Sequence, residues 1–204
     1  DPSLDSELVR MHGHEIRALY SNFKTKWGAD PHERVEPTVE QISAVKQLLD
    51  ADLVPYCCFS VVGTHGRRLV DKLTYLAWQF MPDGTWVRRE LVGPPSFNEW
   101  RSSVRVMRTI YTLLDVVDPV VLENYGDFIR EHVLLYGDAC WFLVDQADRN
   151  MRREQFERLR RQAEQRHVET PMGSNFDPAK PWKTVFRMAL ADAEWWNANM
   201  HRHI

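Results

Sequence analysis

The stretch GPPSFNEWRSSVRVMRTIYTLLDVVDP, residues 93–119, contains the start, the buried face and the end of one helix. Ser96 followed three residues later by Glu99 is a capping box, in which each side chain accepts a hydrogen bond from a backbone N–H at the helix start. Apolar residues then recur at three- and four-residue steps, the spacing of one helical face. Asp118 and Pro119 are an N-cap and a first helical residue, so a second helix is predicted to follow at once. The predicted apolar face consists of Phe97, Trp100, Val104, Met107, Tyr111 and Leu114.

Two further helices are predicted directly after this one. The first begins at Pro119 and ends at Gly137, because glycine commonly follows the last residue of a helix. The second begins at Asp138 and continues to His167 as one long helix. Because the turns between these helices are minimal, the three are expected to pack as antiparallel neighbours in a core over residues 97–166.

Helical segments flank this core at both ends of the chain. Residues 4–27 carry an apolar stripe that ends at Gly28, so residues 1–34 are predicted to form an N-terminal helical arm. Residues 35–167 are predicted to form the core domain, and residues 168–204 a linker with one C-terminal helix.

A short β-hairpin is predicted near residues 74–91. Asp83-Gly84 lies between an apolar run and the alternating sequence TWVRREL, and this dipeptide favours the tight turn that joins two antiparallel strands. The preceding stretch YCCFSVVG, residues 56–63, is interpreted as a strand or a buried extended segment. The predicted fold class is therefore mainly α: a bundle-like helical core with one short β-hairpin and helical N- and C-terminal arms.

The composition of the 204 residues indicates a folded domain, with 44% hydrophobic residues and a net charge of −3. No apolar run is long enough to cross a bilayer, and the acidic N-terminal stretch lacks the apolar region of a secretory signal. Three cysteines, two of them adjacent, do not form a disulfide framework. We therefore expect no membrane partner and an intracellular location, cytoplasmic or nuclear.

Arginines are the most informative candidate site residues. Three of them follow one another at helical spacing within residues 101–108, and seven more lie within residues 149–166 beside only three glutamates. Such a surface could neutralise the phosphates of a nucleic acid. The alternative is that these arginines are solvated or paired with carboxylates one turn away. The predicted nucleic-acid contacts are Arg101, Arg105, Arg108, Arg152, Arg153, Arg160 and Arg161.

Large aromatic residues near the two ends of the chain are candidates for a protein interface. They lie on predicted helices next to polar connections, where they could dock on the body of the chain or on another copy of it. We therefore expect a homo-oligomer. The predicted interface residues are Trp27, Trp182, Phe186, Trp195 and Trp196.

Catalytic and metal-binding signatures are absent from the sequence. No G-x-S-x-G elbow is present, and VVGTHGRR lacks the Lys-Ser/Thr ending of a phosphate-binding loop. No C-x-x-C or H-E-x-x-H spacing occurs either. We accordingly predict no catalytic residue, no metal and no cofactor, and an enzyme of unknown class is the least favoured alternative.

The phrases PTVEQISAVKQLLDADLVPYCCFSVVGTHGRR, GPPSFNEW and LYGDACWFLVDQADRNMRREQFERL give the chain a resemblance to known sequences. Over about residues 36–165 it resembles predicted proteins carried by retroelement-like polyproteins of unicellular algae. The resemblance implies a Gag-like or other particle- or RNA-associated role, outside the polymerase and nuclease parts of such an element.

The expected function is that of a non-enzymatic assembly and nucleic-acid-associated domain, with RNA or DNA and further copies of the chain as partners. The alternative is a helical protein–protein interaction module that binds no nucleic acid. Salt separates the two hypotheses, since phosphate binding weakens steeply as salt rises and docking through aromatic helices does not.

Overall fold

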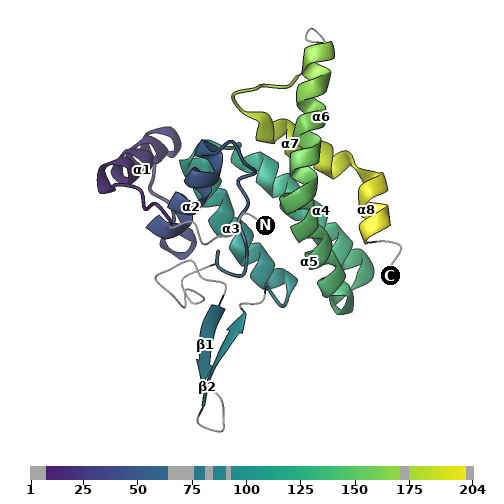
Figure 1. Cartoon of the computed structure of the whole chain (residues 1–204), viewed down its shortest axis with the longest axis horizontal. Helices are drawn as coiled ribbons and strands as arrows, with labels where there is room; N and C mark the ends of the chain where they lie inside the picture. The colour runs from purple at the N-terminus through teal and green to yellow at the C-terminus, as the bar shows by residue number, and fades with distance from the viewer. Residues whose placement is uncertain (1–7, 64–75, 81–84, 91–92, 171–174, 201–204) are drawn as a thin grey trace.

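The computed structural model of the chain describes residues 8–63, 76–80, 85–90, 93–170 and 175–200, and this part is mainly helical, as predicted (Figure 1). The α-helices are α1 (Gly13–Trp27), α2 (Val39–Asp50), α3 (Phe97–Leu113), α4 (Pro119–Tyr136), α5 (Trp141–Asn150), α6 (Phe156–Glu169), α7 (Pro181–Ala191) and α8 (Ala193–Asn199). Short helical turns of other types are η1 (Glu33–Val35), η3 (Asp138–Cys140) and η4 (Met151–Gln155). No helix within the described ranges is long and apolar enough to cross a membrane.

Several of the start and end signals predicted in residues 93–137 are used, although the Asp118 side chain forms no capping hydrogen bond at the start of α4. The Ser96 hydroxyl accepts a hydrogen bond from the backbone N–H of Glu99, and Pro119 lies in the first turn of α4. Gly137 ends α4 with a φ of 80°, a conformation that favours glycine. α3 packs against α4, and α4 packs against α5. These contacts confirm the predicted packing of neighbouring helices in this part of the chain.

The predicted single helix from Asp138 to His167 is interrupted, which corrects that expectation. It begins with the 3-10 turn η3 and contains the π-helical turn η4 between α5 and α6. A π turn inserts an extra residue and so shifts the side-chain register of the helix that follows. At this turn the neighbouring residues Met151 and Arg152, and again Gln155 and Phe156, are all buried.

The N-terminal helix is shorter than predicted, because α1 begins at Gly13. The Glu15 carboxylate accepts the backbone N–H of His12 at 2.8 Å and so caps a helix at this position. Val9 and Met11 lie along α2, where the backbone N–H of Met11 donates to the Ser43 hydroxyl at 2.9 Å. α1 then packs against α3 through half-buried apolar side chains. These are Ile16, Leu19, Tyr20 and Phe23.

The predicted C-terminal helix consists of two helices that meet at Asp192. The Asp192 carboxylate caps α8 by accepting the backbone N–H of Trp195 at 3.1 Å. The Trp196 indole then donates to the carbonyl of Ala189 in α7 at 2.9 Å, which fixes the bend between the two helices.

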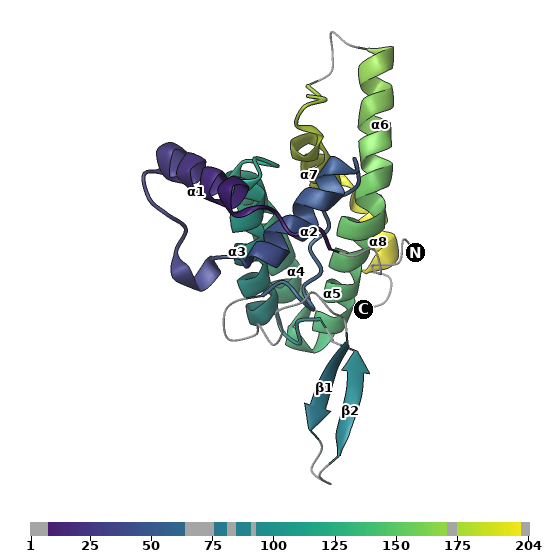
Figure 2. The ribbon, with the colours of Figure 1, turned by 60° about the vertical axis from the view of Figure 1, so that its left-hand side comes forward.

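Two strands occupy the region of the predicted hairpin. β1 (Leu76–Phe80) pairs with β2 (Trp86–Glu90) in an antiparallel register that places Leu76 opposite Glu90. The predicted Asp83-Gly84 turn lies outside the described residues. The strand pair extends away from the helices (Figure 2). The stretch 56–63 has no partner strand among the described residues and is instead a largely buried extended segment with one turn.

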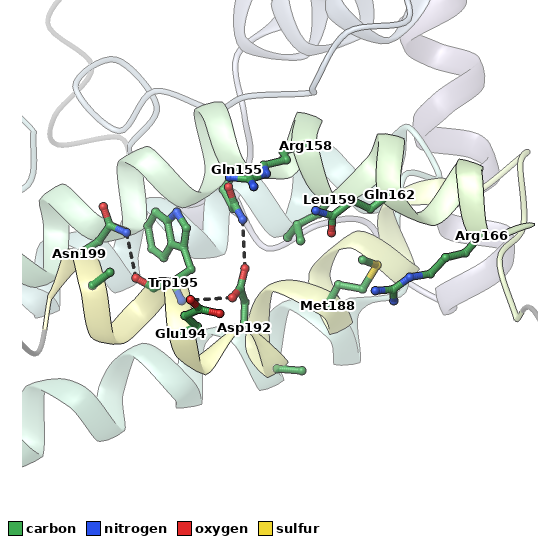
Figure 3. Close-up of a pocket in the computed structure, with 12 residues that line it drawn as sticks. Gln155, Arg158, Leu159, Gln162, Arg166, Met188, Asp192, Glu194, Trp195 and Asn199 are labelled. Atoms are coloured by element: carbon green, nitrogen blue, oxygen red, sulfur yellow. Dashed lines mark hydrogen bonds between the residues drawn. The ribbon is translucent and has the colours of Figure 1, made fainter.

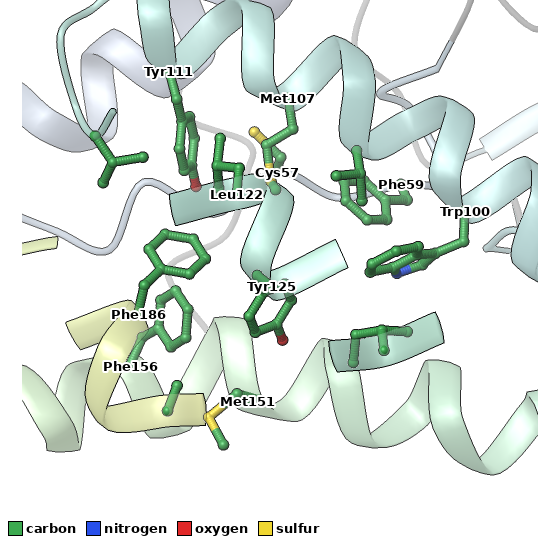
Figure 4. Close-up of a cluster of buried hydrophobic side chains, with 14 of the residues drawn as sticks. Cys57, Phe59, Trp100, Met107, Tyr111, Leu122, Tyr125, Met151, Phe156 and Phe186 are labelled. Carbon is green, nitrogen blue, oxygen red and sulfur yellow. The ribbon is translucent and has the colours of Figure 1, made fainter. Parts of the chain in front are cut away.

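The hydrophobic core joins α2 to α8 and is centred on aromatic side chains (Figure 4). Phe186 of α7 lies edge-on to Tyr125 of α4 and Phe156 of α6, with ring centroids 5.3 and 4.8 Å away. Such edge-to-face pairs are favourable because the positive ring edge meets a negative ring face. The C-terminal helices therefore dock on the body of the chain, one of the two predicted alternatives, and α7 and α8 are part of the core.

Two exposed salt bridges link the end of α1 and the start of α7 to the α3–α4 turn. Asp115 in this turn lies 3.3 Å from the ammonium of Lys26 at the end of α1 and 2.6 Å from that of Lys180 just before α7. The hydrogen bond from Lys180, more than that from Lys26, lowers the pKa of Asp115. Both helices predicted as arms are thus anchored to the same turn.

Candidate functional site

Three of the predicted nucleic-acid contacts lie on the exposed face of α3. Arg101 and Arg105 are exposed one helical turn apart, and neither forms an ion pair with a carboxylate of the described residues. Arg108 lies 2.8 Å from Glu123 of α4 in a pair whose side chains are 44% and 52% exposed. Because pairs this exposed contribute about 0–1 kcal/mol, Arg108 can exchange Glu123 for another anion.

The predicted contacts on η4 and α6 differ in exposure: two are exposed, one is mostly covered, and Arg152 is buried. Arg153 and Arg161 are exposed, and Arg161 is 3.9 Å from a glutamate one turn earlier. Arg160 is mostly covered: it donates to the Asp52 carboxylate at 2.6 Å, and its guanidinium lies 5.4 Å from the centre of the Trp182 ring. The structure therefore uses Arg160 to join α6 to the end of α2 and to α7, as the carboxylate-pairing alternative predicts.

Arg152 is buried, so the prediction that it contacts nucleic acid is wrong. Its side chain is 2% exposed and forms two close contacts with Asp148, at 2.7 Å from Nη2 to Oδ2 and 3.0 Å from Nε to Oδ1. Its Nη1 donates to the carbonyl of Cys57 at 2.8 Å, and the guanidinium lies 4.0 Å from the centre of the Phe59 ring. All its donors face the interior of the chain.

Asp148 is the centre of this buried network. Besides Arg152, its carboxylate accepts hydrogen bonds from the Trp100 indole at 2.8 Å and the Tyr125 hydroxyl at 2.9 Å. The network therefore connects α3, α4, α5 and the π turn. Burial alone would lower the pKa of Arg152, but the charge and hydrogen bonds of Asp148 outweigh it and raise that pKa. Asp148 was not predicted from the sequence, where its spacing of four residues to Arg152 was the available signal.

The buried thiol beside this network is not suited to nucleophilic chemistry. Burial raises the pKa of Cys57 to about 12, so its thiol is protonated at neutral pH. Cys57, Cys58 and Cys140 are all free thiols. No group of three potential metal ligands occurs within the described ranges.

Asp145, one turn before Asp148, is buried with an incomplete set of hydrogen bonds. Its Oδ2 lies 3.1 Å from Arg149 Nε, while its Oδ1 has no hydrogen-bond partner among the described residues. Burial raises the pKa of Asp145 to about 6, against the opposing charge of Arg149. The carboxylate therefore carries its charge at neutral pH in an unfavourable position.

Replacing Asp145 by asparagine is expected to stabilise the chain at pH 7 by about 1 kcal/mol. The folded pKa is above the ordinary value of 3.8, so the folded chain keeps a proton that the unfolded chain releases. This contribution is complete below pH 3.8 and is lost as the pH rises through 6, hence the gain from D145N should shrink by pH 4.5. Urea unfolding of the parent and of D145N at pH 7 and at pH 4.5 measures this difference in stability. The exposed Asp138→Asn is the control, and a D145N variant less stable than the parent at pH 7 would contradict the prediction.

A groove of about 510 Å³ runs between α6 and the α7–α8 pair (Figure 3). Its α6 wall is a single helical face, because the lining residues are three to four positions apart. Arg158 and Arg166 on this wall are exposed, and neither forms an ion pair with a carboxylate in the described ranges. The wall consists of Gln155 at the end of η4 and of Arg158, Leu159, Gln162 and Arg166 of α6.

The opposite wall carries one half-buried aromatic side chain, Trp195. Its ring lies between Asn199 and Gln155 in Figure 3, and the Asn199 amide donates to the Trp195 carbonyl at 2.8 Å. Asp192 on this wall also accepts the Gln155 amide at 3.0 Å, in addition to the cap of α8. Both Asp192 oxygens are therefore held by hydrogen bonds within the fold. Glu194 is the exposed acid of this wall.

The predicted aromatic interface residues separate into a buried and an accessible group. Trp182, Phe186 and Trp196 are 4%, 1% and 1% exposed, so of the two predicted alternatives these side chains follow the first and dock on the body of the same chain. Trp27 is 45% exposed at the end of α1. Trp195 is half-buried and lines the groove. The sequence predicted an aromatic contact at this residue, but it did not predict the groove.

Comparison with protein-family models, with curated proteins and with solved structures found no match to this chain.

Proposed function

We propose that this chain is a non-enzymatic helical domain that associates with nucleic acid through exposed arginines. The observation that carries the proposal is the pair Arg101 and Arg105, which are exposed one turn apart on α3 and have no ion-pair partner among the described carboxylates. An arginine that is not already neutralised can form a charge-assisted hydrogen bond to a phosphate without first breaking a contact. Arg161 of α6 is exposed as well, and its ion pair with Glu157 is long and solvent-exposed, at 3.9 Å.

Self-assembly and a Gag-like role in a retroelement-type protein are part of this proposal. They are supported by the resemblance over residues 36–165. A cytoplasmic or nuclear location is proposed because the three cysteines are free thiols, the state that reducing compartments maintain.

A protein–protein interaction module is the second candidate function. It is favoured by large apolar side chains exposed near the α4–α5 connection, where Leu134, Leu135 and Phe142 are 73%, 70% and 63% exposed. It is also favoured by Arg160, which is neutralised by carboxylates of its own chain. In this alternative the chain associates with another protein, and added RNA does not change the mass of the particle in solution.

Replacing Arg101 and Arg105 together by glutamine is expected to weaken binding to a mixed-sequence single-stranded RNA. Removal of one arginine–phosphate interaction should make the slope of log affinity against log salt shallower by about 0.7, so the pair should change it by about 1.4. Fluorescence anisotropy with labelled RNA at several salt concentrations measures this slope. Light scattering at low and high salt shows whether the mass of the complex rises with RNA.

The matched control is the double variant Arg17→Gln/Arg34→Gln. It removes two exposed arginines from α1 and η1, so it changes the net charge equally and should leave the slope almost unaffected. An unchanged mass of the parent chain with RNA at low salt would reject the proposal and favour the protein-interaction alternative.

A further inference from the structure

We propose that the groove between α6 and the α7–α8 pair binds the bases of a single-stranded nucleic acid, with one base stacked on Trp195 and flanking phosphates at Arg158 and Arg166. The choice of ligand rests on the proposed function, but the site is separate from Arg101 and Arg105 on α3. The groove, of about 510 Å³, is within the range of small-ligand sites.

The α6 wall supplies positive charge at two places along the groove. Arg158 and Arg166 are eight residues apart, which places their backbones about 12 Å apart along the helix axis. Phosphates bound at both would therefore belong to a stretch of several nucleotides and not to a single one. Arg166 extends from α6 toward Met188 of α7, so its guanidinium lies between the two walls (Figure 3).

The opposite wall supplies an aromatic surface. Trp195 is half-buried, and its ring is held edge-on against Trp196 with centroids 5.0 Å apart. A ring fixed in this way loses little freedom when a base stacks on it, and stacking accepts any base because every base has a π-face. Gln162, farther along the α6 wall toward Arg166, is a half-buried amide that can both donate to and accept from the edge of a neighbouring base (Figure 3).

The acids of the groove do not cancel this charge. Asp192 is held by the backbone of Trp195 and by the Gln155 amide, so its oxygens point into hydrogen bonds of the fold. Glu194 is exposed at the edge of the groove, and its negative charge acts on a bound phosphate only by electrostatic repulsion. Removing its charge should therefore strengthen binding of an anionic ligand.

An amphipathic helix is a poorer fit to this groove. Helices that dock in grooves need a continuous apolar surface that receives side chains at successive turns. On the α6 wall the one apolar residue, Leu159, has Gln155 before it and Gln162 after it. The α7–α8 wall does carry apolar side chains at helical spacing, namely Met188, Ala191, Trp195 and Ala198. The α6 wall, however, would meet a docked helix mainly with amides and arginines, which suit the phosphates and base edges of a nucleotide chain better.

The test compares single-stranded hexaadenylate with an abasic hexamer of the same backbone, at fixed low salt. The parent chain is expected to bind hexaadenylate about tenfold more tightly, because stacking is available only to the first ligand. Trp195→Ala should remove this difference, and Trp195→Phe should keep most of it. The double variant Arg158→Gln/Arg166→Gln should weaken the binding of both ligands. Glu194→Gln should strengthen the binding of both. Trp27→Ala, which removes an exposed tryptophan on α1, is the control and should change neither.

The outcomes separate this inference from the proposed function. Equal binding of the two ligands by the parent chain overturns the inference while leaving phosphate binding intact. A base-dependent difference that survives Arg101→Gln/Arg105→Gln supports the groove as an independent site, even where overall affinity falls. No binding of either ligand rejects both proposals, and tight binding of an acidic peptide that is abolished in Trp195→Ala would assign the groove to a protein partner instead.

Discussion

Replacing Arg152 by alanine is expected to lower the free energy of unfolding by about 3–5 kcal/mol. The reason is that the substitution leaves the Asp148 carboxylate, which is 0% exposed, without its counter-charge. The Trp100 indole and the Tyr125 hydroxyl would still donate to it, but neither carries a charge. The carbonyl of Cys57 would lose its donor as well. Urea unfolding followed by circular dichroism measures the loss.

The control for this prediction is an ion pair with the same spacing whose two partners are both exposed. Arg161 of α6 lies 3.9 Å from Glu157, and their side chains are 70% and 44% exposed. Arg161→Ala is therefore expected to change the free energy of unfolding by less than about 1 kcal/mol. A loss below about 1 kcal/mol in Arg152→Ala would show that Asp148 does not depend on this partner, and that the network is not what holds the helices together.

Replacing Phe186 by alanine is expected to destabilise the chain by a similar amount, lowering the free energy of unfolding by about 3–5 kcal/mol. Its ring is 1% exposed and packs edge-on against Tyr125 and Phe156, so the substitution leaves a cavity at the centre of the core. Thermal unfolding should show one cooperative transition at a lower temperature, because α7 unfolds together with the helices it covers.

The neighbouring substitution Arg187→Ala distinguishes this result from a general effect on α7. Arg187 is exposed, so its removal should change stability by no more than about 0.5 kcal/mol. If Phe186→Ala instead left the main transition unchanged and affected only a minor one, the C-terminal helices would behave as the separate arm that the sequence predicts.

The helices between residues 96 and 137 were predictable because their signals are local. A hydroxyl at an N-cap, a proline in the first turn and a glycine after the last turn act on backbone groups within a few residues. Ser96, Pro119 and Gly137 all act in this way in the structure. The breaks at Met151–Gln155 and at Asp192 were missed, since the sequence on both sides of each is equally compatible with a continuous helix.

The candidate site was less predictable, because spacing along one helix does not show what lies opposite. Arg152 and Arg153 are neighbours in a sequence rich in arginine, yet one is buried against Asp148 and the other is exposed. Adjacent residues of a helix point in directions about 100° apart, so only the helices packed around them decide which of the two is buried. The groove is likewise formed by helices that are distant in the sequence, and no local pattern indicates that α6 lies beside α7 and α8.

By itself the sequence determined that the chain is mainly helical, where several of its helices begin and end, and which faces are apolar. These properties depend on backbone hydrogen bonds and on side chains three or four residues apart, which the linear order contains. Only the tertiary structure decided that the C-terminal helices complete the core, that Arg152 is part of a buried network, and that Arg158, Arg166 and Trp195 share a groove. Each of these depends on which residues meet across different helices, and that is set by the packing of the whole chain.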